Sequence, residues 1–148
     1  MVTSSVYVDI KRSLSDVWDY LMNSSNYLKW HDGISELVTT DEMHKGSTLT
    51  LTSAGLGQPI KMTAIITEND GKSCFVARSN RGPIDFVYKH QLMAIAGGTR
   101  VEVVSQINAH AALHLAENVL QESSDYQNIS DLQQLKLILE GIDQPSII

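Results

Sequence analysis

Hydrophobic and polar residues alternate along most of the chain between residues 34 and 110. In the clearest run, Ile60, Met62, Ala64 and Ile66 are separated by residues that are mostly polar. Alternation with a period of two places one face of a strand in the core and the other toward solvent. The pattern predicts seven strands, over residues 6–10, 34–40, 48–52, 60–67, 73–80, 84–93 and 100–109.

Glycine residues mark the predicted turns between these strands. The Asp70-Gly71 pair predicts a hairpin, because these residue types tolerate the positive φ angles of a tight turn. The other turn glycines are Gly55, Gly57, Gly82, Gly97 and Gly98. Successive strands therefore have short connections, which favours antiparallel pairing.

A helical period appears between the first two predicted strands. The apolar residues that recur at helical spacing are Leu14, Val17, Trp18, Leu21 and Met22. Ser13 precedes them as a suitable N-cap, and Asp16 completes a variant of the capping box. Asn23 and the polar residues after it stop this helix and cap a short second one through Trp30, which ends before Gly33.

The C-terminal segment also has a helical period, but its apolar residues fall into two stripes. The first stripe consists of Leu113, Ala116, Val119 and Leu120, and the second of Leu132, Leu135 and Leu139. Leu113 and Leu132 are 19 residues apart, which is about 100° beyond five whole helical turns. We therefore expect two helical pieces, kinked or separated at residues 123–125, with Gly141 ending the second.

This order of elements predicts an α+β fold. A seven-stranded antiparallel sheet would curl around the long C-terminal helical segment, with two short helices between its first two strands. Sheet and helix would then enclose a cavity, an expectation that the polar character of the helical segment at residues 123–127 also supports. Such a cavity favours a small hydrophobic ligand over a macromolecular partner.

Composition excludes several classes of protein. The 148 residues fit a single domain over 1–148. The net charge is −6 and the 11 Lys and Arg residues are scattered, whereas nucleic-acid binding needs a basic patch. No apolar run approaches the ~20 residues that insert across a membrane, and residues 1–5 lack the basic start of a secretory signal. With Cys74 as the only cysteine, no intrachain disulfide can form, and we expect a cytoplasmic monomer or homodimer.

Several short stretches carry a resemblance to a known family. They are residues 17–21 (VWDYL), 27–31 (YLKWH), 46–48 (GST), 97–101 (GGTRV), 131–136 (DLQQLK) and 139–140 (LE). Their order and spacing, over nearly the whole chain, resemble the START and birch-pollen-allergen (SRPBCC) superfamily, and within it the polyketide cyclase/dehydrase-like branch. The resemblance implies a helix-grip fold with an internal cavity for lipids, sterols, polyketides or similar molecules. It implies no shared set of catalytic residues.

The inner faces of the predicted strands supply most candidate ligand contacts. These are Met62, Phe86, Tyr88, His90, Val103, Ser105 and Ile107, joined by Trp30 from the short second helix. His90 is the inner-face residue whose charge can change near neutral pH, so it is suited to hydrogen-bond or protonate a ligand. The alternative is a core histidine satisfied by its neighbours. Trp30 is likewise either a stacking surface or a packing anchor.

The other histidines do not form a recognisable metal site. His110, His114 and Glu117 have a spacing like that of zinc ligands on a helix. His110, however, is predicted at the end of a strand, which breaks this geometry, so no metal is predicted. His31 and His44 lie in predicted turns, where we expect them to be solvated.

Cys74 and Arg78 complete the candidates. Cys74 has no Lys or His beside it in sequence, which predicts an inert thiol, because reactive thiols need an electropositive setting. Arg78 is equally compatible with the cavity and with the outer face of the sheet. The sequence has no phosphate-binding glycine loop and no nucleophile elbow. We predict no catalytic set and no cofactor.

Three functional hypotheses remain. The first is a binder of a small hydrophobic molecule such as a lipid or polyketide. The second is an enzyme of the cyclase or dehydratase type, in which His90 and Tyr88 act as acid or base; it needs at least two polar groups converging in the cavity. The third is an interaction module resembling the domain that activates the Hsp90 chaperone, which needs an exposed apolar patch.

Overall fold

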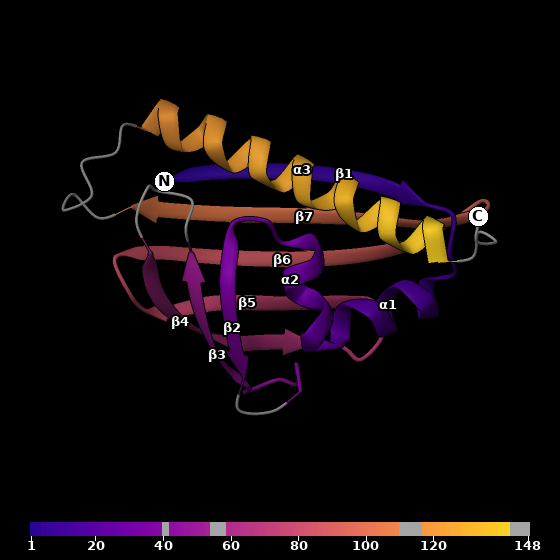
Figure 1. The fold of residues 1–148 in the computed structure, drawn as a ribbon, viewed down its shortest axis with the longest axis horizontal. Coiled ribbons are helices and arrows are strands. Elements are labelled where there is room, and N and C mark those ends of the chain that lie inside the picture. The colour runs from indigo at the N-terminus through magenta and orange to yellow at the C-terminus, as the bar shows by residue number, and fades with distance from the viewer. Residues whose placement is uncertain (40–41, 54–58, 110–116, 143–148) are drawn as a thin grey trace, which may run out of the picture.

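The computed structural model describes residues 1–39, 42–53, 59–109 and 117–142. A single sheet lies behind three helices (Figure 1). The elements in chain order are β1 (Val2–Ile10), α1 (Leu14–Met22), a 3-10 turn (Ser24–Asn26), α2 (Tyr27–Trp30), β2 (Ile34–Thr39), β3 (Thr48–Ser53), β4 (Ile60–Asn69), β5 (Cys74–Arg81), β6 (Ile84–Ile95), β7 (Gly98–Ala109) and α3 (Glu117–Ile142).

The sheet is seven-stranded and antiparallel throughout. Its strand order is β1-β7-β6-β5-β4-β3-β2, so β1 and β2 form the two edges. Helix α3 packs against β1 and runs along β1 and β7, while α1 and α2 lie at the other side of the same face (Figure 1). The predicted helix grip is confirmed, including the two short helices between the first two strands.

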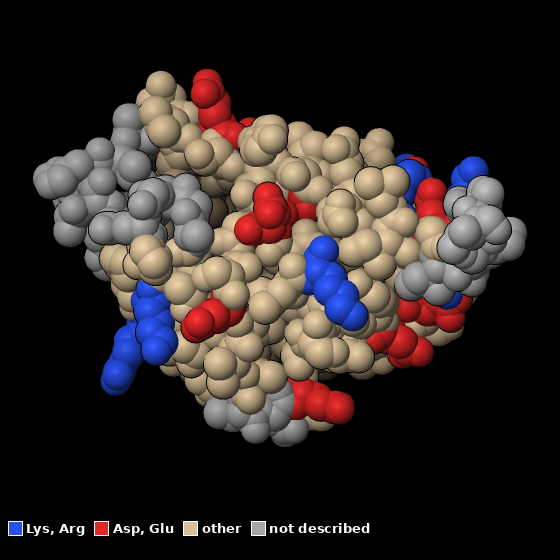
Figure 2. Space-filling view, viewed as in Figure 1, with Lys and Arg blue, Asp and Glu red and all other residues tan. Residues whose placement is uncertain are grey.

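The surface charges do not gather by sign on the face that carries α3. Lys and Arg side chains lie singly or in small groups, and Asp and Glu side chains lie between them (Figure 2). Such a face lacks the basic patch that a nucleic-acid backbone needs. Among the described residues, no helix is both long and apolar enough to cross a bilayer.

Strand β1 begins earlier than predicted. It starts at Val2 and pairs along β7, with Val2 opposite Ile107. Val2 and Ser4 are both buried, on the same face of the strand as the later apolar residues. Ser4 is small and polar, so it interrupts the apolar alternation on which the sequence-based boundary at residue 6 depended.

Helix α1 has the predicted cap. The Ser13 side chain accepts a hydrogen bond from the Asp16 backbone N–H at 3.2 Å, which satisfies one of the free donors at the helix start. Val17, Trp18 and Leu21 are buried from this helix. The apolar stripe read from the sequence is therefore the face that α1 packs on the rest of the protein.

Helix α3 corrects the prediction of two helical pieces, because it is continuous from Glu117 to Ile142. The three buried polar residues of the helix are Ser124, Asn128 and Asp131, and the three buried leucines are Leu132, Leu135 and Leu139. The six follow one another at helical spacing, so the inward stripe runs on and changes from polar to apolar. A pattern of apolar residues alone indicates only the second half of this stripe. Gly141 lies inside the last turn, and the predicted stripe members Leu113 and Ala116 fall outside the described residues.

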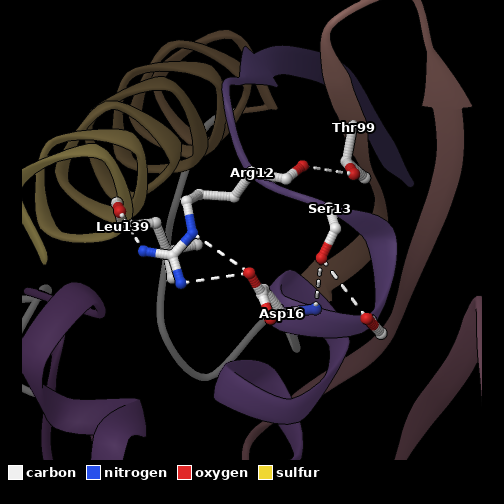
Figure 3. A network of polar contacts seen from close by, with 6 residues as sticks. Arg12, Ser13, Asp16, Thr99 and Leu139 are labelled. Carbon is white, nitrogen blue, oxygen red and sulfur yellow. Dashed lines mark hydrogen bonds and ion pairs between the residues drawn. The ribbon is translucent and has the colours of Figure 1, made fainter. Parts of the chain in front are cut away.

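A polar network fixes the end of α3 to the connection between β1 and α1 (Figure 3). The Arg12 guanidinium donates to the Leu139 carbonyl oxygen at 3.0 Å and to the Asp16 carboxylate at 3.1 Å. The Thr99 hydroxyl donates to the Arg12 carbonyl oxygen at 2.9 Å. A cation near the C-terminal carbonyls of a helix also complements its dipole. Three elements distant in sequence are thereby held at one end of the sheet.

Among the described glycines, Gly98 is the one at which an added Cβ would come closest to another part of the backbone, and it gives a stability prediction. A Cβ at this position would collide with the carbonyl oxygen of Ile10. We expect Gly98→Ala to lower the free energy of unfolding by about 1 to 3 kcal/mol, as overpacking does, in urea denaturation followed by circular dichroism. Gly141→Ala is the matched control, because a Cβ there meets no heavy atom within 4 Å and alanine favours a helix. Equal stability of the two variants would contradict the prediction.

Candidate ligand-binding cavity

A cavity of about 350 Å³ lies between the sheet and helix α3. Strands β2 to β7, α2 and α3 all contribute to its lining. Most of the lining side chains are apolar, including Leu49, Leu51, Phe75 and Ala77. Ligand pockets have volumes of roughly 300 to 1,000 Å³ and mostly apolar walls with a few polar groups. The cavity falls at the small end of this range.

The predicted ligand contacts divide into two groups. Five of them line the cavity: Met62, Phe86, Tyr88, His90 and Ile107. The other three, Trp30, Val103 and Ser105, are buried but do not line it. Ser105 instead accepts a hydrogen bond from the Asn128 side chain of α3 at 3.0 Å, and so helps to attach the helix to β7. Contact of any of the eight with a ligand stays a prediction.

His31 corrects the expectation that it is solvated. It follows α2 directly, is 7% exposed, and its Nδ1 lies 2.9 Å from Asp131 Oδ2 on α3. The carboxylate also accepts from the Asp32 backbone N–H at 3.2 Å and from the Gln127 amide at 2.7 Å. His31 and Asp131 line the cavity together. Helix α3 therefore buries His31, which its sequence neighbours alone place in an open turn. His44, in contrast, is exposed, as predicted.

Aromatic rings hold both cavity histidines in place. His31 stacks on Tyr27, with ring centroids 4.0 Å apart, and lies against Trp30 at 3.8 Å. His90 stacks on Phe75 at 4.3 Å with its ring almost parallel to the phenyl ring. The two imidazole centroids are 6.4 Å apart. The cavity thus has one end at which two histidines approach each other within an apolar wall.

Several buried nitrogen atoms of these aromatic residues have no hydrogen-bond partner among the described residues. They are His31 Nε2, both ring nitrogens of His90 and Trp30 Nε1. An unsatisfied buried polar group costs about 1 to 3 kcal/mol, and such groups in native proteins call for a functional or solvent explanation. The two histidines that line the cavity therefore have hydrogen-bonding capacity that the described residues do not satisfy.

Burial also determines the charge state of the cavity groups. It lowers the pKa of His90 to about 3, with the neighbouring His31 as a smaller cause. Burial, and to a smaller extent the Asp131 carboxylate, raises the pKa of Tyr88 to about 12. Burial is also the chief cause that raises the pKa of Tyr27. At neutral pH, His90 is consequently an uncharged hydrogen-bonding group and has no proton to give as an imidazolium.

The remaining candidates lie away from this end. Arg78 is exposed and does not line the cavity. Of its two predicted positions, the structure therefore favours the outer face of the sheet over the cavity. Cys74 is half-buried, and burial raises the pKa of its thiol, consistent with the predicted inert cysteine. Among the residues that the structure describes, no His, Cys, Asp and Glu side chains gather as metal ligands. His110, His114 and the Glu117 side chain fall outside the described set.

The sequence reasoning missed Asp131 and His31 as members of the site. Asp131 lies four residues before Leu135 and eight before Leu139, so it shares the helix face that those leucines bury. A carboxylate in a buried stripe is rarely placed there without partners. That spacing is the signal by which Asp131 could have been found.

The fold and the cavity define a START-like helix-grip protein of the SRPBCC superfamily. Residues 1–135 match the family model described as polyketide cyclase/dehydrase and lipid transport, and the chain belongs to that family. No curated protein matches the sequence.

Solved structures share the fold at low sequence identity. The protein TTHA0849 from Thermus thermophilus has a TM-score of 0.82 at 11% identity, covering 96% of this chain and 99% of that one. The Zhui aromatase/cyclase from a Streptomyces species has a TM-score of 0.82 at 11% identity, covering 96% and 95%. A START superfamily protein from Mycobacterium smegmatis has a TM-score of 0.81 at 12% identity, covering 95% and 98%. Identities this low establish the fold alone.

Proposed function

We propose that this protein binds a small hydrophobic molecule in the cavity between the sheet and α3. The observation that carries the proposal is an apolar cavity of about 350 Å³ with unpartnered histidine nitrogens at one end. Apolar walls supply affinity through burial, and a few placed polar groups supply orientation. Membership of a family described by polyketide chemistry and lipid transport supports the same class of ligand.

Native mass spectrometry of freshly purified protein is the direct test. A co-purified lipophile would support the proposal and give the ligand class. A thermal-shift panel of fatty acids, sterols and polyphenols should also contain stabilising compounds, since a ligand at 100 times its dissociation constant adds about 2.7 kcal/mol. Protein that carries no adduct and responds to no compound in the panel would contradict the proposal.

An enzyme of the cyclase or dehydratase type is the second candidate. The observation in its favour is the convergence of His31, Asp131, His90 and Tyr88 on one cavity. Because the pKa of His90 is lowered to about 3, His90 is not suited to be the general acid, and the His31–Asp131 pair is the better proton-transfer group. Loss of water from a bound hydroxylated polyketide, seen as a mass change only with active protein, would distinguish this enzyme from a carrier.

The interaction-module hypothesis has less support. The large apolar residues exposed on the described strands are Tyr7, Val38 and Met93. Tyr7 lies on β1 and Val38 on β2, which are opposite edges of the sheet. Interaction surfaces usually present a contiguous apolar patch, and these residues do not combine into one.

Replacing His90 tests the cavity from its inner wall. We expect His90→Phe to fold with equal or greater stability, because a phenyl ring fills similar space without two unpartnered nitrogens. Affinity for a stabilising compound from the panel should fall by about 1 to 3 kcal/mol. Melting and titration of the same variant measure both quantities. Unchanged affinity together with a lower melting temperature would mean that His90 is a core histidine without contact to ligand.

A further inference from the structure

The hydrogen bond to Asp131 determines which nitrogen of His31 carries a proton. Oδ2 of the carboxylate lies 2.9 Å from Nδ1, and Oδ1 already accepts from Asp32 and Gln127. A carboxylate only accepts, so Nδ1 must donate. In a neutral imidazole the other nitrogen is then an acceptor. In the uncharged ring, His31 Nε2, which is buried and has no partner among the described residues, is therefore an acceptor.

His90 supplies the complementary group. Its ring is 1% exposed, lines the cavity, and has both nitrogens unpartnered within the described chain. An uncharged imidazole always carries one N–H donor and one acceptor. The two ring centroids are 6.4 Å apart, and both side chains line the same cavity, His31 from the residue after α2 and His90 from β6. The pair therefore offers an acceptor and a donor close to each other in the cavity wall.

We propose that this end of the cavity recognises a single uncharged hydroxyl group on the hydrophobic ligand, which donates to His31 Nε2 and accepts from His90. The inference rests on the proposed function and specifies its ligand as a hydrophobic alcohol or phenol. A hydroxyl is both donor and acceptor, so one such group satisfies both histidines. A ketone or ether accepts only and leaves His31 Nε2 unpaired.

Charged head groups fit this end poorly. Among the described lining residues, none is Lys or Arg, and Asp131 is the only acid. A ligand carboxylate would find no cation and would approach the Asp131 carboxylate, and an unpaired buried charge is costly. An alkylammonium would reach His31 Nε2 but has no acceptor for the His90 N–H. Fatty acids and long-chain amines are therefore expected to bind more weakly than the corresponding alcohols.

Two series of probes separate the contribution of the head group to affinity from that of the hydrophobic body. The first is 2-naphthol, 2-methylnaphthalene, 2-methoxynaphthalene and 2-naphthoate; the second is 1-decanol, decylamine and decanoate. Binding is measured by titration calorimetry or by naphthol fluorescence. We expect 2-naphthol to bind about tenfold tighter than the size-matched 2-methylnaphthalene, the ratio that one net hydrogen bond of about 1.4 kcal/mol gives. We also expect 1-decanol to bind tighter than decylamine and decanoate.

Two variants test the role of His31. His31→Phe keeps an aromatic ring against Tyr27 but removes the acceptor, so the preference for naphthol over methylnaphthalene should fall several-fold. Asp131→Asn keeps the side-chain shape, while its amide donates to Nδ1 and moves the ring proton to Nε2. The affinity for 2-methoxynaphthalene, which only accepts hydrogen bonds, should then rise relative to the affinity for 2-naphthol. His44→Phe, a substitution at an exposed histidine, should change neither ratio.

The outcomes separate the two levels of the proposal. Tightest binding by the hydroxyl probes, with the ratios shifted as stated in the variants, supports it. Equal binding within a series, or tightest binding by decanoate, naphthoate or decylamine, overturns the hydroxyl site and leaves the hydrophobic cavity as the proposed function. Failure of every probe in both series, together with protein that carries no co-purified lipophile, overturns both. An unchanged naphthol preference in a folded Asp131→Asn variant, with methoxynaphthalene no tighter, rejects the assigned tautomer.

Discussion

The Asp131→Ala variant should unfold with a free energy about 3 to 5 kcal/mol lower than that of the unchanged protein. Asp131 is 4% exposed and accepts hydrogen bonds from His31 Nδ1, the Asp32 N–H and the Gln127 amide. Removing one partner of a buried polar cluster leaves the others without compensation, which is the costly way to break such a cluster. Helix α3 would lose its attachment to the segment after α2.

Urea denaturation of the variant, followed by tryptophan fluorescence, gives this free energy. Trp30 lies against His31, so its emission reports on the affected region. Asp19→Ala is the matched control, because Asp19 is exposed on α1 and surface substitutions usually change stability by no more than about 0.5 kcal/mol. A loss in Asp131→Ala no greater than in the control would show that the cluster contributes nothing to the attachment of α3.

The sheet was predictable because its strands obey a simple physical rule. In β4, Ile60, Met62, Ala64 and Ile66 are all buried, and the residues between them are not. One face of each strand meets the core and the other meets solvent, so the alternation is directly visible in the sequence. His90 follows this rule too, which is why it was found as an inner-face residue.

Helix α3 was less predictable because its buried face is not uniformly apolar. Ser124, Asn128 and Asp131 are buried on the same face of α3 as Leu135 and Leu139. Asn128 and Asp131 can be buried because partners satisfy them, Ser105 for Asn128 and His31 for Asp131. Hydrophobic periodicity carries no information about such partners, so it predicts a kink or a break where the stripe is polar.

The polar end of the cavity was the hardest feature to predict. His31 and Asp131 are 100 residues apart in the chain, and only the passage of α3 over α2 brings them together. No local pattern around His31 distinguishes a buried histidine from a solvated one. What distinguishes it is the hydrogen bond to Asp131 on α3, which is a contact distant in sequence.

Ala77→Phe should abolish binding of any cavity ligand, with affinity lower by at least about 100-fold, or about 2.7 kcal/mol. Ala77 is buried on β5 and lines the cavity, with Tyr88 beside it on β6. A benzyl group in place of the methyl group would occupy space that a ligand needs. Because the added ring fills existing cavity, we expect stability to change little, unlike overpacking of a filled core.

Titration of a stabilising compound into this variant, with a melting curve on the same sample, measures both effects. Ala94→Phe is the matched control, since Ala94 is an exposed residue of the same sheet, and it should bind as the unchanged protein does. If Ala77→Phe proves unstable, Ala77→Leu offers a smaller step with a proportionately smaller loss. A folded Ala77→Phe variant that binds normally would place the ligand outside the cavity, because side chain and ligand cannot share the same space.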